Sequence, residues 1–186
     1  MSKERLDRRG RLEQGLLVRR EPIRLERTRT AAARDRLKAR IAERCGIADD
    51  RLLDELASLA VEEAAIPALA LLPLAEIAWA DGQVDTAERN AVLQAAERAG
   101  VLEEPAAARQ LIAWLDHPPP AITFEVALSL IEQTCRSLDA ATRDAVRDEL
   151  LDRARTVATA SGGLFGRGTV CPAEARVLER VQKVVR

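Results

Sequence analysis

The near-absence of aromatic side chains is the feature that most limits how this chain can fold. Among 186 residues there are two Trp, two Phe and no Tyr, although hydrophobic residues make up 47% of the sequence. A core of Ala, Leu and Val without rings packs helices closely and suits strands badly. No alternating strand pattern of useful length occurs in the sequence. We therefore predict an all-α fold, a compact helical bundle.

Start and stop signals divide residues 46–186 into about seven predicted helices. They run from Asp49 or Asp50 to Ala60, Ile66 to Ala80, Thr86 to Ala99, Pro105 to His117, Ile122 to Leu138, Asp139 to about Ala160, and from Pro172 onward. The segment Ile66–Ala80 is apolar almost all round, as expected of a central helix that is buried on most sides. Pro73 should kink this helix or mark a join.

The first 45 residues differ from the rest in charge and in apolar content. Residues 1–44 carry 15 Lys or Arg and 7 Asp or Glu, whereas the remaining residues carry 14 and 23. Their apolar side chains are too sparse to bury a core, although Ala, Arg, Glu and Leu favour helix. We expect residues 1–45 to form an extended helical arm, broken near Glu21–Pro22, and residues 46–186 to form the domain.

Three roles remain open for this basic arm. It can be a solvated helix, it can dock on an acidic protein surface, or it can bind nucleic acid or a membrane periphery. Interspersed acidic residues and the lack of aromatic residues in the arm weigh against nucleic acid. We favour a protein partner and leave a homo-oligomer open. The candidate contact residues are Arg8, Arg9, Arg19 and Arg20.

A glycine-rich segment near the C-terminus is a second candidate contact surface. Four of the nine glycines lie between residues 161 and 170. The run Gly162-Gly-Leu-Phe-Gly-Arg-Gly168 lacks the Lys-Ser/Thr ending of a phosphate-binding loop, and no strand precedes it. Leu164 and Phe165 are therefore either tucked inward or exposed as a contact patch.

Two segments of the chain share one pattern, in which a small-residue helix enters a glycine turn and a new helix begins before a glutamate. The first is Ala78-Trp-Ala-Asp-Gly-Gln-Val-Asp-Thr-Ala-Glu88. The second runs from Ala154 into glycine and restarts, after an insertion, at Thr169-Val-Cys-Pro-Ala-Glu174. We predict two pseudo-repeated helix–loop–helix units, the second with a lengthened loop.

The first motif resembles the TerB family of tellurite-resistance-like helical domains, whose hallmark is A-x-A-D-G-x-[IV]-x-x-x-E. The resemblance covers about residues 60–186 and implies an all-α fold of internally related halves. It also implies an acidic metal site and association with stress-response or membrane-linked complexes in bacteria. Carried over to this chain, the metal ligands are Asp81, Asp85 and Glu88. Glu76, Glu174 or water would supply further ligands.

The acidic residues of the first motif admit two interpretations. Hard divalent cations bind carboxylate and carbonyl oxygens, so Ca²⁺, Mg²⁺, Mn²⁺ or Zn²⁺ is a candidate cofactor. Alternatively, Asp85-Thr-Ala-Glu88 has the pattern of a capping box, and Cys171-Pro-Ala-Glu174 is its weaker counterpart. Capping explains Glu88 and Glu174 without any ion. The second loop has Ser161 and Cys171 where the first has Asp81 and Asp85, so we expect no second metal site.

Other chemistry is not indicated by the sequence. His117 is the single histidine, and the three cysteines form no CxxC, so neither a triad, a disulfide framework nor a zinc cluster is expected. We expect Cys171 to be inert, and we expect the chain not to be an enzyme. The longest wholly apolar stretch, Ala64–Ala75, is too short to span a bilayer, and the charged N-terminus lacks the apolar core of a secretory signal. A cytoplasmic protein is expected.

The sequence therefore leaves two hypotheses of function. The first is a non-catalytic TerB-like interaction or sensing module that binds a divalent metal at Asp81–Glu88. The second is a metal-free structural adaptor whose N-terminal arm docks on a partner protein.

Overall fold

The computed structural model describes residues 31–43, 46–59, 61–160 and 170–185. The chain divides into two compact units, Met1–Arg40 and Ile41–Arg186. The division between the units falls a few residues before the end of the predicted arm at residue 45. Residues 31–43 are helical. The predicted break at Glu21–Pro22 and the candidate contact residues lie outside the described residues. Those contact residues are Arg8, Arg9, Arg19, Arg20, Leu164 and Phe165.

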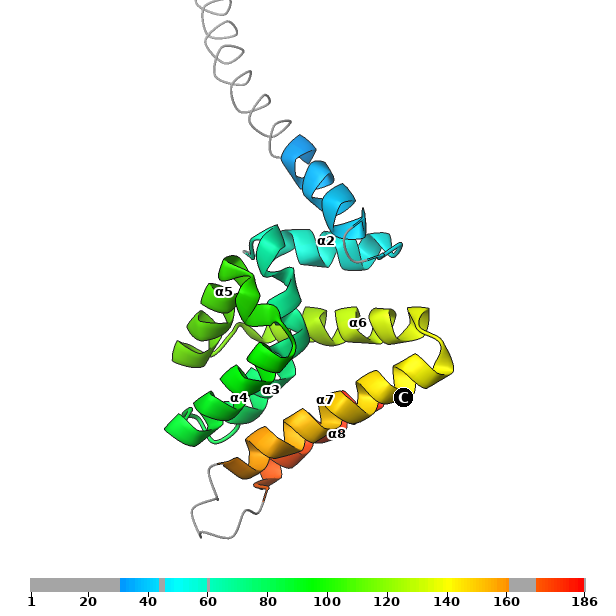
Figure 1. Ribbon diagram of the computed structural model, residues 1–186. Coiled ribbons are helices and arrows are strands. Elements are labelled where there is room, and N and C mark those ends of the chain that lie inside the picture. The colour runs from blue at the N-terminus through cyan, green and yellow to red at the C-terminus, as the bar shows by residue number, and fades with distance from the viewer. Residues whose placement is uncertain (1–30, 44–45, 60, 161–169, 186) are drawn as a thin grey trace, which may run out of the picture. The chain divides into compact units, whose positions relative to one another are not determined.

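Seven α-helices and two 3₁₀ helices are described in the second unit (Figure 1). In chain order they are α2 (Asp50–Ser58), η1 (Glu63–Leu71), α3 (Leu72–Ala78), α4 (Thr86–Arg98), η2 (Val101–Glu103), α5 (Pro105–Asp116), α6 (Ala121–Ser137), α7 (Ala140–Ala160) and α8 (Pro172–Val184). No strand occurs among the residues that the structure describes. The predicted all-α bundle is confirmed.

Helix ends follow the local chemistry of the sequence. The Asp49 side chain accepts hydrogen bonds from the backbone N–H groups of Arg51 and Leu52, and so caps the start of α2. The Asp139 carboxylate accepts from the Thr142 backbone N–H at 3.0 Å, at the start of α7. Gly100 follows α4 with a φ of +69°, a left-handed conformation that glycine adopts without steric cost. These boundaries agree with the predicted ones to within about two residues.

The segment predicted as one helix over Ile66–Ala80 has a more broken form. Pro67 lies inside η1, and Pro73 lies in the first turn of α3. Proline has no amide hydrogen, and its ring obstructs the carbonyl one turn earlier, so a continuous α-helix does not run through both residues. The join at Pro73 is confirmed, whereas the 3₁₀ geometry before it was not predicted.

Helix α3 forms the centre of the second unit. Leu72, Leu74 and Ile77 are all 0% exposed, and α3 packs against α4, α5, α6, α7 and α8. In Figure 1 the long helix α7 lies alongside α8, and both also pack against α3. The predicted central helix, buried on most sides, is therefore confirmed. The two helix–loop–helix units, α3–α4 and α7–α8, pack directly on each other through this core.

One residue of the α7 apolar stripe is not in the core. Helical periodicity predicts that Val146, Leu150 and Val157 share the apolar face of this helix. Leu150 and Val157 are buried, whereas Val146 is 38% exposed and lines an open groove with residues of η1 and α6.

In the described part of the chain, no single helix combines the length and the apolar composition that crossing a membrane requires. Asp50–Ser58 and Glu63–Ala78 meet that requirement only when taken together, and they are bent by 101° relative to each other.

Candidate functional site

The first loop, between α3 and α4, is a tight turn that is anchored to α5. The Gly82 backbone N–H donates to the Trp79 carbonyl at 2.9 Å, and Gly82 has a φ of +97°. The Asp81 carboxylate accepts from the Gln83 backbone N–H at 3.1 Å. The Trp79 indole N–H donates to the Trp114 carbonyl at 2.7 Å. Because this bond joins residues 35 positions apart in the chain, it links the position of the loop to that of α5.

A complete capping box closes the start of α4. Oδ1 of Asp85 accepts from the Glu88 backbone N–H at 2.8 Å, and Oε2 of Glu88 accepts from the Asp85 backbone N–H at 2.9 Å. Glu88 is only 2% exposed. The capping interpretation of Asp85-Thr-Ala-Glu88 is confirmed.

The second helix–loop–helix unit, α7–α8, repeats this arrangement at the start of α8. Sγ of Cys171 accepts from the Glu174 backbone N–H at 3.4 Å, and Oε2 of Glu174 accepts from the Cys171 backbone N–H at 2.6 Å. Glu174 is 5% exposed. Glu88 and Glu174 are thus two of the three buried polar side chains in the described part of the chain. The predicted counterpart of the first capping box is confirmed.

The negative charge of Glu174 acts on the buried Glu88 carboxyl. Burial raises the pKa of Glu88 to about 7, against the lowering effect of its hydrogen bond from the Asp85 backbone. The negative charges of Asp85, Asp81 and Glu174 raise the pKa further. The structure therefore brings four carboxylates from both helix–loop–helix units into one region. We call Asp81, Asp85, Glu88 and Glu174 the acidic cluster.

Glu76, a predicted further ligand, lies in a different electrostatic environment. Burial raises the pKa of this half-buried carboxyl, the charge of Arg180 lowers it and the charge of Glu125 raises it. Arg180 binds Glu125 at 2.6 Å and stacks over the Phe124 ring at 4.6 Å. The charges that act on Glu76 thus come from α6 and α8, and not from the first loop.

The acidic cluster has the oxygen chemistry of a hard-cation site without the arrangement of one. Among the described residues, no group of three or more His, Cys, Asp or Glu side chains is placed to hold a metal ion. The cap and turn hydrogen bonds use Oδ1 of Asp81, Oδ1 of Asp85 and Oε2 of Glu88. Each carboxylate keeps a second oxygen outside these bonds. The predicted metal site remains a prediction, and Ser161 of the second loop lies outside the described residues.

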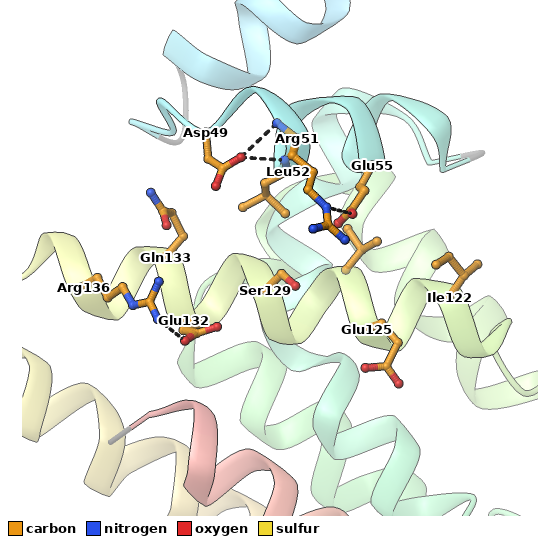
Figure 2. Close-up of a pocket in the computed structure, with 11 residues that line it drawn as sticks. Asp49, Arg51, Leu52, Glu55, Ile122, Glu125, Ser129, Glu132, Gln133 and Arg136 are labelled. Carbon is orange, nitrogen blue, oxygen red and sulfur yellow. Dashed lines mark hydrogen bonds and ion pairs between the residues drawn. The ribbon is translucent and has the colours of Figure 1, made fainter.

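A polar groove of about 400 Å³ lies between α2 and α6 (Figure 2). Its two arginines are each paired with a lining carboxylate, because Arg51 binds Glu55 at 3.1 Å and Arg136 binds Glu132 at 2.5 Å. Figure 2 shows Glu125 pointing away from α2, and this residue binds Arg180. The lining carboxylates outnumber the two lining arginines, so the groove does not favour an anionic ligand.

A second groove, of about 470 Å³, lies among η1, α6 and α7 and is mostly apolar. No local sequence pattern predicts this groove, because its wall combines residues of η1, the segment after α4, α6 and α7. Val146, a partly exposed residue of the predicted apolar face of α7, lines this groove.

Comparison with known proteins identifies no relative of this chain. No family model matches the chain, and neither does any curated protein or solved structure. The resemblance of Ala78–Glu88 to the TerB motif therefore stays a prediction. What the chain does is inferred from the geometry of its own residues.

Proposed function

We propose that this chain is a non-catalytic interaction module whose acidic cluster senses a divalent cation. The observation that supports the proposal is the buried Glu88 carboxyl, whose pKa of about 7 is raised by burial and by the charges of Asp81, Asp85 and Glu174. A cation bound among these groups would offset the mutual repulsion of their carboxylates, which otherwise destabilises the folded state. The remaining carboxylate oxygens are the hard donors that Ca²⁺, Mg²⁺ and Mn²⁺ prefer.

The first loop would be the responsive element of such a module. Its turn depends on the Asp81 carboxylate and on Gly82, and its helix start depends on Asp85 and Glu88. The bond from Trp79 to the Trp114 carbonyl links loop movement to α5. A change at the acidic cluster would thus alter the surface offered to a protein partner. In line with the TerB resemblance, we propose a bacterial, cytoplasmic, stress-response setting.

A metal-free structural adaptor is the second candidate, and the completed capping boxes favour it. Glu88 and Glu174 each accept a cap hydrogen bond from the backbone, and capping is a role that requires no ion. In this alternative the acidic cluster only stabilises the starts of α4 and α8, and the arm of residues 1–45 contacts the partner.

The thermal unfolding midpoint of metal-stripped protein distinguishes the two candidates. A sensing module should show a saturable rise with one of Ca²⁺, Mg²⁺, Mn²⁺ or Zn²⁺. An ion at about 100 times its Kd stabilises the folded state by about 2.7 kcal/mol, which corresponds to roughly 5–10 °C for a chain of this length. Trp79, two residues before Asp81, should change its fluorescence over the same concentration range.

Asp81→Asn combined with Asp85→Asn is the discriminating variant. Asparagine keeps a side-chain acceptor and is a good helix N-cap, so the variant should fold while losing two charges. The matched control is Asp148→Asn combined with Asp152→Asn, two exposed positions on α7. A rise that the first variant abolishes and the control retains supports sensing. If no ion at millimolar concentration shifts the wild-type midpoint, sensing is wrong and the adaptor stands.

A further inference from the structure

The polar groove between α2 and α6 has an excess of negative charge. Each of its two arginines binds one carboxylate, and both of these pairs lie within a single helix. Two further carboxylates line the groove, and the arginine that binds one of them, Arg180 on α8, is not a lining residue. The charged lining residues are Asp49, Glu55, Glu125, Glu132, Arg51 and Arg136.

The ion pairs within the groove are open to exchange with an incoming cation. The side chain of Arg51 is 89% exposed and that of Arg136 is 70% exposed. Pairs of this kind, between residues four apart on a solvated helix, contribute only about 0.3–0.5 kcal/mol. A carboxylate can also accept hydrogen bonds from more than one donor. The local arginines therefore leave the groove accessible to guanidinium groups from another chain.

An exposed isoleucine at one end of the groove adds an apolar contact. Ile122 is 59% exposed, more than any other large hydrophobic side chain in the described part of the chain. Figure 2 shows Ile122 and Arg136 at opposite ends of the row of α6 side chains, with carboxylates between them. An occupant that carries both cationic and aliphatic side chains fits this arrangement.

The N-terminal segment of the chain has this composition. Residues 1–30 carry 10 Lys or Arg and 5 Asp or Glu, and aliphatic residues lie next to arginines throughout the segment. The acidic residues of the domain are concentrated at the groove, since residues 49–63 carry six Asp or Glu and one Arg. Complementary charge favours the encounter and the register of two such surfaces. The chain therefore contains both a basic segment and an acidic groove that fits it.

A second copy of the chain can supply the basic segment. Residues 31–43 are helical and span about 20 Å at 1.5 Å per residue. This spacer allows residues 1–30 to reach a neighbouring molecule. Because every copy has one segment and one groove, two copies that exchange segments fill both grooves and form a closed, two-fold symmetric dimer.

We propose that the groove between α2 and α6 binds residues 1–30 of a second copy of this chain, so that two copies exchange their N-terminal segments in a symmetric dimer. This inference does not rest on cation sensing, because none of the acidic-cluster residues lines the groove. Asp81→Asn combined with Asp85→Asn should therefore leave dimerisation unchanged. In the adaptor alternative, the inference identifies a partner of the arm as a second copy.

Sedimentation equilibrium of the full-length chain over a wide range of micromolar concentrations tests the dimer. We expect a monomer–dimer equilibrium at about 0.1 M salt and at least tenfold weaker association at about 1 M salt, where the Debye length falls from about 10 to 3 Å. Glu55→Lys combined with Glu132→Lys should weaken the dimer at least tenfold. The control is Asp148→Lys combined with Asp152→Lys, which makes the same change in net charge at two exposed positions on α7, and it should associate as wild type does.

A charge exchange between two chains tests the contact itself. Arg19→Glu combined with Arg20→Glu changes the N-terminal segment and leaves the domain intact, so it also covers the case in which the groove variant does not fold. This variant alone should associate at least tenfold more weakly than wild type. Mixed with the groove variant, it should form heterodimers, because each groove then meets a segment of opposite charge.

Three results would overturn the proposal. The first is a wild-type chain that stays monomeric at every concentration, as it would if the groove bound the segment of its own chain. The second is a dimer that the groove and segment variants retain as fully as the α7 control. The third is a mixture of the two variants that associates no better than either variant alone.

Discussion

Replacing Glu88 with glutamine is expected to raise the free energy of unfolding by on the order of 2 kcal/mol at pH 8. The wild-type carboxyl has a folded-state pKa of about 7, above its usual value of 4.5. The folded chain therefore holds the Glu88 proton more firmly than the unfolded chain does. The stability that this carboxyl contributes is fully present below about pH 4.5 and is lost as the pH rises through about 7. Glutamine stays neutral, so its contribution does not change with pH.

Denaturant unfolding at several pH values from 5 to 8, with a metal chelator present, measures this effect. Glutamine keeps a side-chain oxygen that can accept from the Asp85 backbone N–H, so the comparison isolates the charge. The variant should match the wild type near pH 5 and exceed it increasingly toward pH 8. Glu97→Gln, at an exposed position on the same helix, is the matched control and should follow the wild type. A difference between Glu88→Gln and wild type that does not grow with pH would contradict the assignment.

Replacing Leu74 with alanine is expected to lower the free energy of unfolding by about 2–5 kcal/mol. Leu74 is 0% exposed and lies in α3, which contacts five other α-helices. The substitution removes packed methyl groups and leaves a cavity that rigid neighbouring helices cannot fill.

Urea unfolding at fixed pH measures this loss. An unchanged slope of the unfolding free energy against urea concentration would show that unfolding exposes the same surface in variant and wild type. Ile112→Ala is the control, because Ile112 on α5 is 39% exposed and should lose much less. Equal losses for the two variants would mean that α3 is not the centre of the fold.

Local patterns in the sequence predict the parts of the structure that depend on a few neighbouring residues. Asp85-x-x-Glu88 and Cys171-x-x-Glu174 predict two capping boxes, and both form. The apolar run before Asp81 predicts the central helix. Pro73 predicts its join, because a missing amide hydrogen acts within one turn.

Other features depend on how distant segments pack, and no local sequence pattern predicts them. The burial of Glu88 and the effect of Glu174 on it arise from packing between the two helix–loop–helix units, and these two glutamates are 86 positions apart in the chain. The apolar groove is built from η1, α6, α7 and the end of α4. Helical periodicity places Val146 on the buried face, but the groove leaves this residue partly exposed.

The cation-sensing proposal depends on the raised pKa of the buried Glu88 carboxyl, and a titration of that side chain is its sharpest test. Carboxyl ¹³C resonances of glutamate-labelled, metal-free protein can be followed by NMR from pH 3 to pH 9, in the wild type and in Glu174→Gln. We predict a Glu88 pKa of about 7 in the wild type and a lower pKa in the variant, where the neighbouring charge is gone. A wild-type Glu88 pKa near the usual 4.5 would show that burial does not perturb this carboxyl, and an equal pKa in wild type and variant would show that the Glu174 charge does not act on it.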